Sequence, residues 1–166
     1  SIPMTKEGEF KDVIVPAIVS EDSVGVARYK GKELYDKTEE IIRRAHIKPL
    51  ISSKRITVQL YESAVDFMWY LWCGSNSPQF DKSAMTTFER YFIDDTNSHT
   101  EIKGDYYTLR TQEKICNKIL EEFGLNPAES HIINGHVPVK AKDGELPVKA
   151  NGKLMVIDGG FSRAYQ

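Results

Sequence analysis

Residues 131–160 read HIINGHVPVKAKDGELPVKANGKLMVIDGG, and this stretch predicts the architecture of the C-terminal part of the chain. Three short runs within it are rich in apolar residues: His131–Ile133, roughly Glu145–Lys149 and Leu154–Ile157. The pairs Asp143-Gly144 and Asn151-Gly152 are typical of tight turns, because Asn, Asp and Gly tolerate a left-handed backbone. The stretch therefore predicts a small β structure of short strands joined by turns.

Upstream of this stretch the apolar residues recur at helical rather than strand spacing. One face of Lys32–Ile47 is apolar, and Pro49 closes that segment. Thr111–Phe123 has the same periodicity and is followed by Gly124, a common residue just after a helix end. Both segments are predicted to be amphipathic helices.

Two more helices are predicted between them. Glu62–Cys73 is apolar on most sides, which is typical of a largely buried helix, and it ends at Gly74. Ile56–Tyr61 is either a short strand or the beginning of that helix. Asp81 is a good N-cap for a further helix over Lys82–Ile93. The aromatic stripes of these two helices are predicted to lie in the core: Phe67, Trp69, Tyr70 and Trp72 in the first, Phe88, Tyr91 and Phe92 with Met85 in the second.

Near the N-terminus, Val13–Val15 and Ala17–Val19 flank Pro16 and predict short strands or an extended connection. Helices followed by a β end segment favour an α+β fold, or a part of a layered α/β/α fold. No linker-like segment and no internal repeat divides the 166 residues.

The composition excludes several classes of protein. It is 40% hydrophobic and 28% charged, as in globular domains, and the net charge of −2 gives no general attraction to nucleic acid or to acidic membranes. No apolar run approaches the ~20 residues of a membrane helix, and the first residues lack the pattern of a signal peptide. Cys73 and Cys116 stand alone, so we predict reduced core cysteines in a cytoplasmic protein.

His136 is the strongest candidate for a metal ligand. It follows a short apolar run through Asn134-Gly135, which allows a sharp turn that presents the imidazole at the strand's carboxyl end. Open α/β sheets collect ligands at that end of their strands. The alternative is that His136 is an ordinary turn residue.

Asp158, Gly159 and Gly160 follow the last predicted strand. As a plain strand-ending turn, Asp158 would accept backbone N–H groups and the glycines would take positive φ. As part of a site, the glycines would let the backbone approach a phosphate or a metal-bound group closely.

The local excess of lysine is the third candidate feature. Four lysines lie between residues 137 and 153 against Asp143 and Glu145. They either form a solvated hairpin face or attract an anionic substrate as mobile point charges. Lys82 and Arg90, eight residues apart on one predicted helix, are surface charges or a phosphate clamp. The hairpin lysines are Lys140, Lys142, Lys149 and Lys153. His99 lies in a polar segment and is predicted to be a loop residue rather than a catalyst.

Several familiar catalytic patterns are missing from the sequence. It has no GxGxxG, no GxxxxGK[ST], no HExxH and no convincing order of Ser, His and Asp. A two-metal hydrolase needs several Asp, His and Asn ligands to hold cations ~3.5–4 Å apart. The sequence offers one good candidate.

Three longer strings resemble a known family. NGHVPVK followed by NGKLMVIDGGFSRAYQ resembles the last metal-ligand block of calcineurin-like metallophosphatases. More narrowly, residues 70–93 (YLWCGSNSPQFDKSAMTTFERYFI), residues 99–107 (HTEIKGDYY) and the closing stretch from Asn134 resemble class III fructose-1,6-bisphosphatase, a large bacterial type. The resemblance covers nearly the whole chain, and its strings are long and unusual.

The family's other metal blocks are not found: Asp-x-His, Gly-Asp-x-x-Asp-Arg, Gly-Asn-His, and a His-Gly expected just before Ser1. The resemblance therefore implies the C-terminal part of such an enzyme, without its N-terminal metal-binding lobe. Only His136 is carried over as a ligand, with Asn134, Gly135, Asp158, Gly159 and Gly160 as supporting residues.

The resemblance implies the C-terminal part of a calcineurin-like sandwich with a helical insertion. Residues 1–29 would be a strand or connection, residues 30–125 the insertion and residues 131–166 the β-rich end segment. It also implies a Mn²⁺-dependent fructose-1,6-bisphosphatase of gluconeogenesis in the cytoplasm, compatible with a homo-oligomer, while the isolated chain would be inactive. A related metallophosphatase acting on phosphoproteins or dinucleoside polyphosphates, and a non-catalytic regulatory or assembly module, stay open as alternatives.

Overall fold

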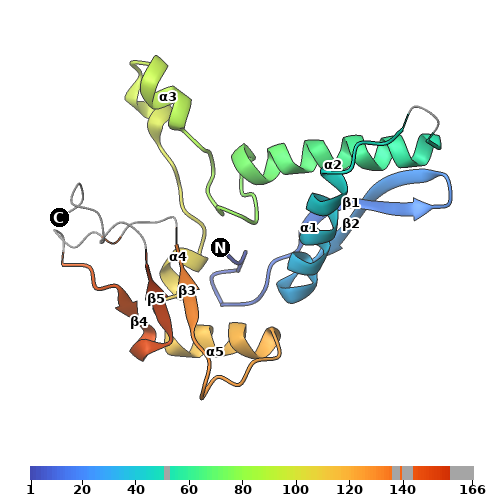
Figure 1. Cartoon of the computed structure of the whole chain (residues 1–166). Helices are drawn as coiled ribbons and strands as arrows, with labels where there is room; N and C mark the ends of the chain where they lie inside the picture. The colour runs from blue at the N-terminus through green and yellow to red at the C-terminus, as the bar shows by residue number, and fades with distance from the viewer. Residues whose placement is uncertain (51–52, 136–138, 140–143, 158–166) are drawn as a thin grey trace. The chain divides into compact units, whose positions relative to one another are not determined.

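The computed structural model describes residues 1–50, 53–135, 139 and 144–157. It divides into two compact units, Ser1–Tyr106 and Tyr107–Gln166. Helices and small sheets occur in both, which confirms a mixed α+β chain (Figure 1). The three-segment organisation implied by the resemblance stays a prediction.

Unit 1 begins with a two-stranded antiparallel sheet. Strand β1 (Val13–Ser20) pairs with β2 (Ser23–Tyr29), and the register is continuous from Val13↔Tyr29 to Ile18↔Val24. Pro16 lies inside β1, so the predicted alternatives of short strands or an extended connection around it are realised as one continuous extended strand. The partner strand β2 was not predicted.

Two helices cover this sheet and build the core of unit 1. Helix α1 (Gly31–Ala45) and α2 (Arg55–Cys73) confirm the two predicted helices, and residues 56–61 belong to α2 rather than to a strand. Each element contributes its apolar face, because burial of those side chains is the main stabilising term. The core consists of Val13, Val15, Leu34, Ile41, Ala64, Phe67 and Leu71.

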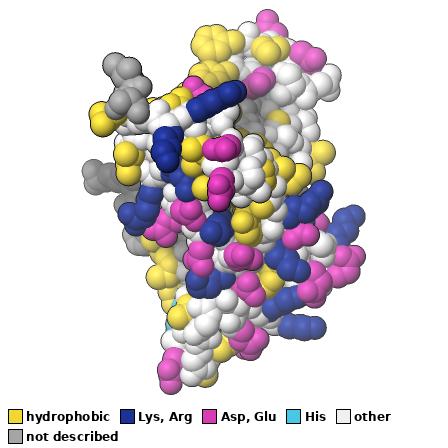
Figure 2. Space-filling model, turned by 90° about the vertical axis from the view of Figure 1, so that its right-hand side faces the viewer, with side chains coloured by type: hydrophobic (Ala, Val, Ile, Leu, Met, Phe, Trp, Pro, Cys, Tyr) yellow, Lys and Arg dark blue, Asp and Glu magenta, His cyan; other side chains and the backbone are white. Residues whose placement is uncertain are grey.

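The solvent-facing side of α1 is stabilised by ion pairs at helical spacing. Lys37 with Glu40 and Arg44 with Glu40 lie within 3.0 Å, and Arg43 pairs with Glu39 at 2.6 Å. Such exposed pairs contribute little to stability, because water and salt screen the attraction. Figure 2 shows one face of the molecule, on which positively charged Lys and Arg side chains alternate with negatively charged Asp and Glu side chains.

The aromatic stripe of α2 does not lie wholly in the core. Phe67 is buried as predicted, whereas Trp69 and Trp72 are 58% and 49% exposed. Cys73, predicted to be a core residue, is also exposed, while Cys116 is fully buried. Because α2 is apolar on most sides, its sequence does not indicate which side faces the core. In the structure the side with Ala64, Phe67 and Leu71 contacts the sheet.

The helix predicted over residues 82–93 is much shorter. Helix α3 covers Thr87–Phe92, follows Thr86, and is followed by the 3₁₀ helix η1 (Thr96–His99). Asp81 is not its N-cap: its backbone has φ +47°, and its N–H donates to Ser77 at 2.7 Å. The predicted core stripe is exposed as well: Phe88, Tyr91 and Phe92.

Unit 2 contains α5 (Glu113–Glu122), which confirms the predicted helix before Gly124. Gly124 has φ +71° and donates to Glu121, and the Leu125 N–H donates to Leu120 at 2.9 Å. These bonds satisfy the last carbonyls of the helix. The short helix α4 (Tyr106–Leu109) precedes α5.

A three-stranded sheet completes unit 2, in the order β3-β5-β4. Strand β3 (Ile132–Asn134) runs parallel to β5 (Leu154–Val156), and β4 (Val148–Lys149) runs antiparallel to β5. The 3₁₀ turn η3 (Ala150–Gly152) links β4 to β5 with Asn151 and Gly152 at φ +52° and +89°. This confirms the predicted Asn-Gly turn and the strands near residues 131–133 and 154–157, whereas the middle strand is confirmed only over Val148–Lys149 of the predicted 145–149. Leu154, Cys116 and Ala150 form a small core.

Candidate functional site

The carboxyl ends of β3 and β5 lie side by side at one edge of the unit 2 sheet. Asn134 is the register partner of Val156, and the Ile157 N–H donates to the Asn134 carbonyl at 2.9 Å. Gly135 comes next, and an added Cβ would meet no atom of the described residues within 4 Å. Two strand ends that the sequence singled out are therefore brought together.

The central site candidates lie outside the described residues. These are His136, Lys140, Lys142, Asp158, Gly159 and Gly160. Among the residues that the structure does describe, no group of three or more His, Cys, Asp or Glu side chains could hold a metal ion. The roles of all six stay predictions.

Two of the four hairpin lysines are described. The Lys153 ammonium donates to the Pro127 carbonyl. Lys149, on β4, is partly buried and its ammonium pairs with the carboxylate of Glu145. A phosphate ligand would have to compete with that carboxylate for Lys149.

Lys82 and Arg90 are brought together, although not along one helix as predicted. Lys82 precedes α3 and binds Glu101 Oε2 at 2.8 Å. Glu101 Oε1 accepts the Thr86 N–H at 3.0 Å and the Thr86 hydroxyl at 3.1 Å. Arg90 in turn donates from Nε to Thr86 Oγ1 at 3.0 Å. Both cations thus belong to one network around Thr86 and Glu101.

This network shifts the acidity of Glu101. Desolvation is the largest influence and raises the pKa, but the hydrogen bonds from Lys82 and Thr86 together outweigh it and lower the pKa to about 2. A carboxylate with a lowered folded pKa stabilises the fold above its ordinary value of 4.5, and that contribution is lost as the pH falls toward 2.

Glu101→Gln is therefore expected to flatten the acid dependence of stability. Between pH 4.5 and 2.5 the free energy of unfolding, measured in urea, should fall less steeply for this variant than for the original chain. At pH 7 the variant should lose about 1–3 kcal/mol, because the uncharged amide keeps one acceptor oxygen where Lys82 and Thr86 use two. Glu40→Gln on the exposed face of α1 is the control and should change both values much less. Equal acid slopes for Glu101→Gln and the original chain would contradict the assignment.

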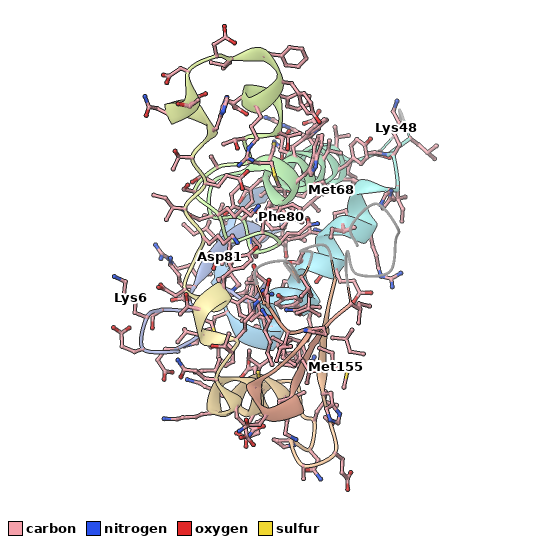
Figure 3. The ribbon with its side chains drawn as sticks, turned by 90° about the vertical axis from the view of Figure 1, so that its left-hand side faces the viewer. Lys6, Lys48, Met68, Phe80, Asp81 and Met155 are labelled. Atoms are coloured by element: carbon pink, nitrogen blue, oxygen red, sulfur yellow. The ribbon has the colours of Figure 1, made fainter. Side chains whose placement is uncertain are left out.

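Asp81, for which no functional role was predicted, lines a hollow of about 480 Å³ in unit 1 with Lys11, Asp12 and Asn76. Its side chain is buried, and Oδ2 has no hydrogen-bond partner among the described residues. Burial raises the pKa of Asp81, opposed by the nearby charge of Lys11. Figure 3 shows Asp81 beside Phe80 on the loop that follows α2. The signal available in the sequence was its place in the unusual GSNSPQFDK string.

Asp81 also fits against Gly104. The Gly104 N–H donates to the Asp81 carbonyl at 2.6 Å, and a Cβ built on Gly104 would lie 1.9 Å from Asp81 Oδ2. The carboxylate therefore occupies the space that a side chain at position 104 would need.

No helix among the described residues has the length and apolar character required to cross a membrane.

His99, predicted to be a loop residue, ends η1, and its Nε2 lies 3.0 Å from the Glu89 carbonyl and 2.8 Å from the Ile93 carbonyl. Two carbonyl partners make Nε2 a donor, which is a structural role.

Comparison with known proteins places this sequence in a family. The family model described as Firmicute fructose-1,6-bisphosphatase matches residues 1–166. Proteins named fructose-1,6-bisphosphatase class 3 from Porphyromonas gingivalis and Fusobacterium nucleatum are each 55% identical, over 100% and 99% of this chain, respectively. A protein of the same name from Clostridium novyi is 51% identical over 99%.

The chain spans 23% of the length of each of these three relatives. No solved structure shows a significant match. The family model covers every residue of the sequence, and the relatives agree with it. The chain therefore belongs to the Firmicute fructose-1,6-bisphosphatase family.

Proposed function

We propose that this chain is part of a metal-dependent fructose-1,6-bisphosphatase that hydrolyses the 1-phosphate of fructose 1,6-bisphosphate. The support is family membership over the whole chain and the names of relatives that are 50–55% identical. The products would be fructose 6-phosphate and phosphate, as in gluconeogenesis in the cytoplasm. A calcineurin-like sandwich with a helical insertion is the corresponding fold proposal.

The observation that supports a site in this chain is the parallel pairing of β3 and β5. Their carboxyl ends lie at one edge, and in the sequence Gly135-His136 and Asp158-Gly159-Gly160 follow those ends. Ligands bind at this edge of open α/β sheets. We propose His136 as a metal ligand, with Asn134, Gly135, Asp158 and the two following glycines as supporting residues.

The donor types suit the proposed cofactor. Imidazole and carboxylate oxygen both bind Mn²⁺, and bound Mn²⁺ would supply an activated water and Lewis-acid stabilisation of the phosphoryl charge. One histidine cannot hold two cations, so the other ligands would come from the part of the family's polypeptide outside this sequence. The hairpin lysines would hold the anionic substrate, and Lys82 and Arg90 could do so only by giving up their bonds to Glu101 and Thr86.

A chimeric enzyme tests this proposal directly. In the P. gingivalis relative, the segment matching this chain is replaced by residues 1–166, and phosphate release from fructose 1,6-bisphosphate is measured with added Mn²⁺. We expect activity within about tenfold of the parent relative, and none above background from the 166-residue chain alone. Robust hydrolysis by the isolated chain would contradict the account of the missing ligands.

The same assay separates the alternatives. Preference for a phosphoprotein or a dinucleoside polyphosphate over the sugar bisphosphate would favour a related metallophosphatase. A folded chimera without any hydrolase activity would favour a non-catalytic module.

A further inference from the structure

The segment from residue 84 to residue 101, here called the α3–η1 arm, is anchored by a short backbone pairing. Lys82 and Lys103 form an antiparallel bridge, and the Ser83 N–H donates to the Ile102 carbonyl at 2.8 Å. The Ile102 N–H returns a bond to Ser83 Oγ at 2.9 Å. The two ends of the arm are therefore held side by side.

Polar contacts give the arm a defined conformation. His99 binds the carbonyls of Glu89 and Ile93, which connects η1 to the C-terminal end of α3. Arg90 reaches from α3 to Thr86 and, at 3.3 Å, to the His99 carbonyl. These bonds take the place of the apolar packing that normally holds a short helix, since six residues are too few for stability alone.

The large apolar side chains of the arm remain in solvent. Neither α3 nor η1 contains a buried residue, and α3 packs chiefly against η1. Phe88, Tyr91 and Phe92 are 63%, 79% and 81% exposed. In Figure 1, α3 stands apart from α1, α2 and the β1–β2 hairpin of the same unit.

Three exposed rings on one rigid helix are unusual for a surface that faces only water. Aromatic residues are enriched at the centres of interfaces, and a preorganised element loses little entropy when it binds. We propose that the arm is a docking element whose rings Phe88, Tyr91 and Phe92 are buried by another part of the family's polypeptide.

The length of the relatives is the reason for choosing this occupant. The chain spans 23% of each, so most of the family's polypeptide lies outside it. A remainder on the same polypeptide would be present in equal amount and could bury the rings within one molecule. A second copy of this chain is the competing occupant.

Oxidative footprinting tests the proposal. The chimera and the isolated chain are exposed to hydroxyl radicals, and oxidation of Phe88, Tyr91 and Phe92 is read by mass spectrometry against Phe67, which is buried in the core. We expect oxidation of the three rings to fall in the chimera toward the level of Phe67, because a buried side chain is shielded from the radicals. Equal oxidation in both proteins would overturn the proposal. So would protection that grows with the concentration of the isolated chain, because a second copy would then cover the arm.

A set of variants gives a second, independent readout. Replacing all three rings with glutamine should lower the thermal midpoint of the chimera by roughly 4 °C or more and leave that of the isolated chain unchanged. The matched control is Thr87→Gln, which puts the same side chain on an exposed position of α3 without removing a ring. A loss confined to the isolated chain, or equal losses for control and triple variant, would contradict docking.

Discussion

Gly104→Ala is expected to destabilise unit 1 by about 3 kcal/mol or more, at the upper end of what overpacking costs. The new Cβ would lie 1.9 Å from Asp81 Oδ2 and 2.1 Å from Asp81 Cγ, so one of the two residues has to move. Asp81 cannot move easily. Its backbone is held at positive φ and is bonded on both sides, to Ser77 and to Gly104 itself.

The measurement is urea unfolding of the 166-residue chain with Asp81→Gly as the compensating change. Glycine accepts φ +47° and removes the carboxylate, so the double variant Gly104→Ala/Asp81→Gly should recover most of the lost stability. Gly135→Ala is the control, since its Cβ would meet no atom of the described residues within 4 Å, and it should change stability by less than about 0.5 kcal/mol. Failure of Asp81→Gly to compensate would show that the contact is not the cause.

His136→Ala in the chimera is expected to lower kcat/KM by roughly a thousandfold, which corresponds to about 4 kcal/mol of transition-state stabilisation. The reason is the loss of the proposed metal ligand. Bound manganese, measured on the purified protein, should fall in parallel. The control is His131→Ala, an exposed histidine at the start of the same stretch, which should keep full activity.

Two results would count against this role of His136. Unchanged metal content with lost activity would make it a substrate-binding or acid–base residue instead. Full activity would remove it from the site altogether, without affecting the family assignment.

The C-terminal strands could be predicted because their signals are local. Asn151-Gly152 specifies a tight turn by its own backbone preferences, and short apolar runs on either side of such a turn favour strands. The same is true of Gly124 after α5. The pairing of β3 with β5 gave the site its one observable feature, although the parallel direction was not predicted.

The errors arose where tertiary contacts decide. Asp81 looked like an N-cap, but its bonds to Ser77 and Gly104 put it in a loop and delayed the helix to Thr87. Whether Trp69 and Trp72 are buried depends on which face of α2 contacts the sheet. The local sequence of a largely apolar helix does not indicate that face. Strand β2 was missed because a glycine and an arginine interrupt the apolar residues of SVGVARY.

Pro16 has a consequence for how this chain behaves when it is handled alone. Pairing with Val26 passes through it in register, as expected where the proline nitrogen faces away from the partner strand. The outer edge of β1 therefore lacks a donor at its midpoint. An incoming strand could not complete its ladder there, which protects a hairpin carrying exposed Ile14, Ile18 and Val26 against edge-to-edge aggregation.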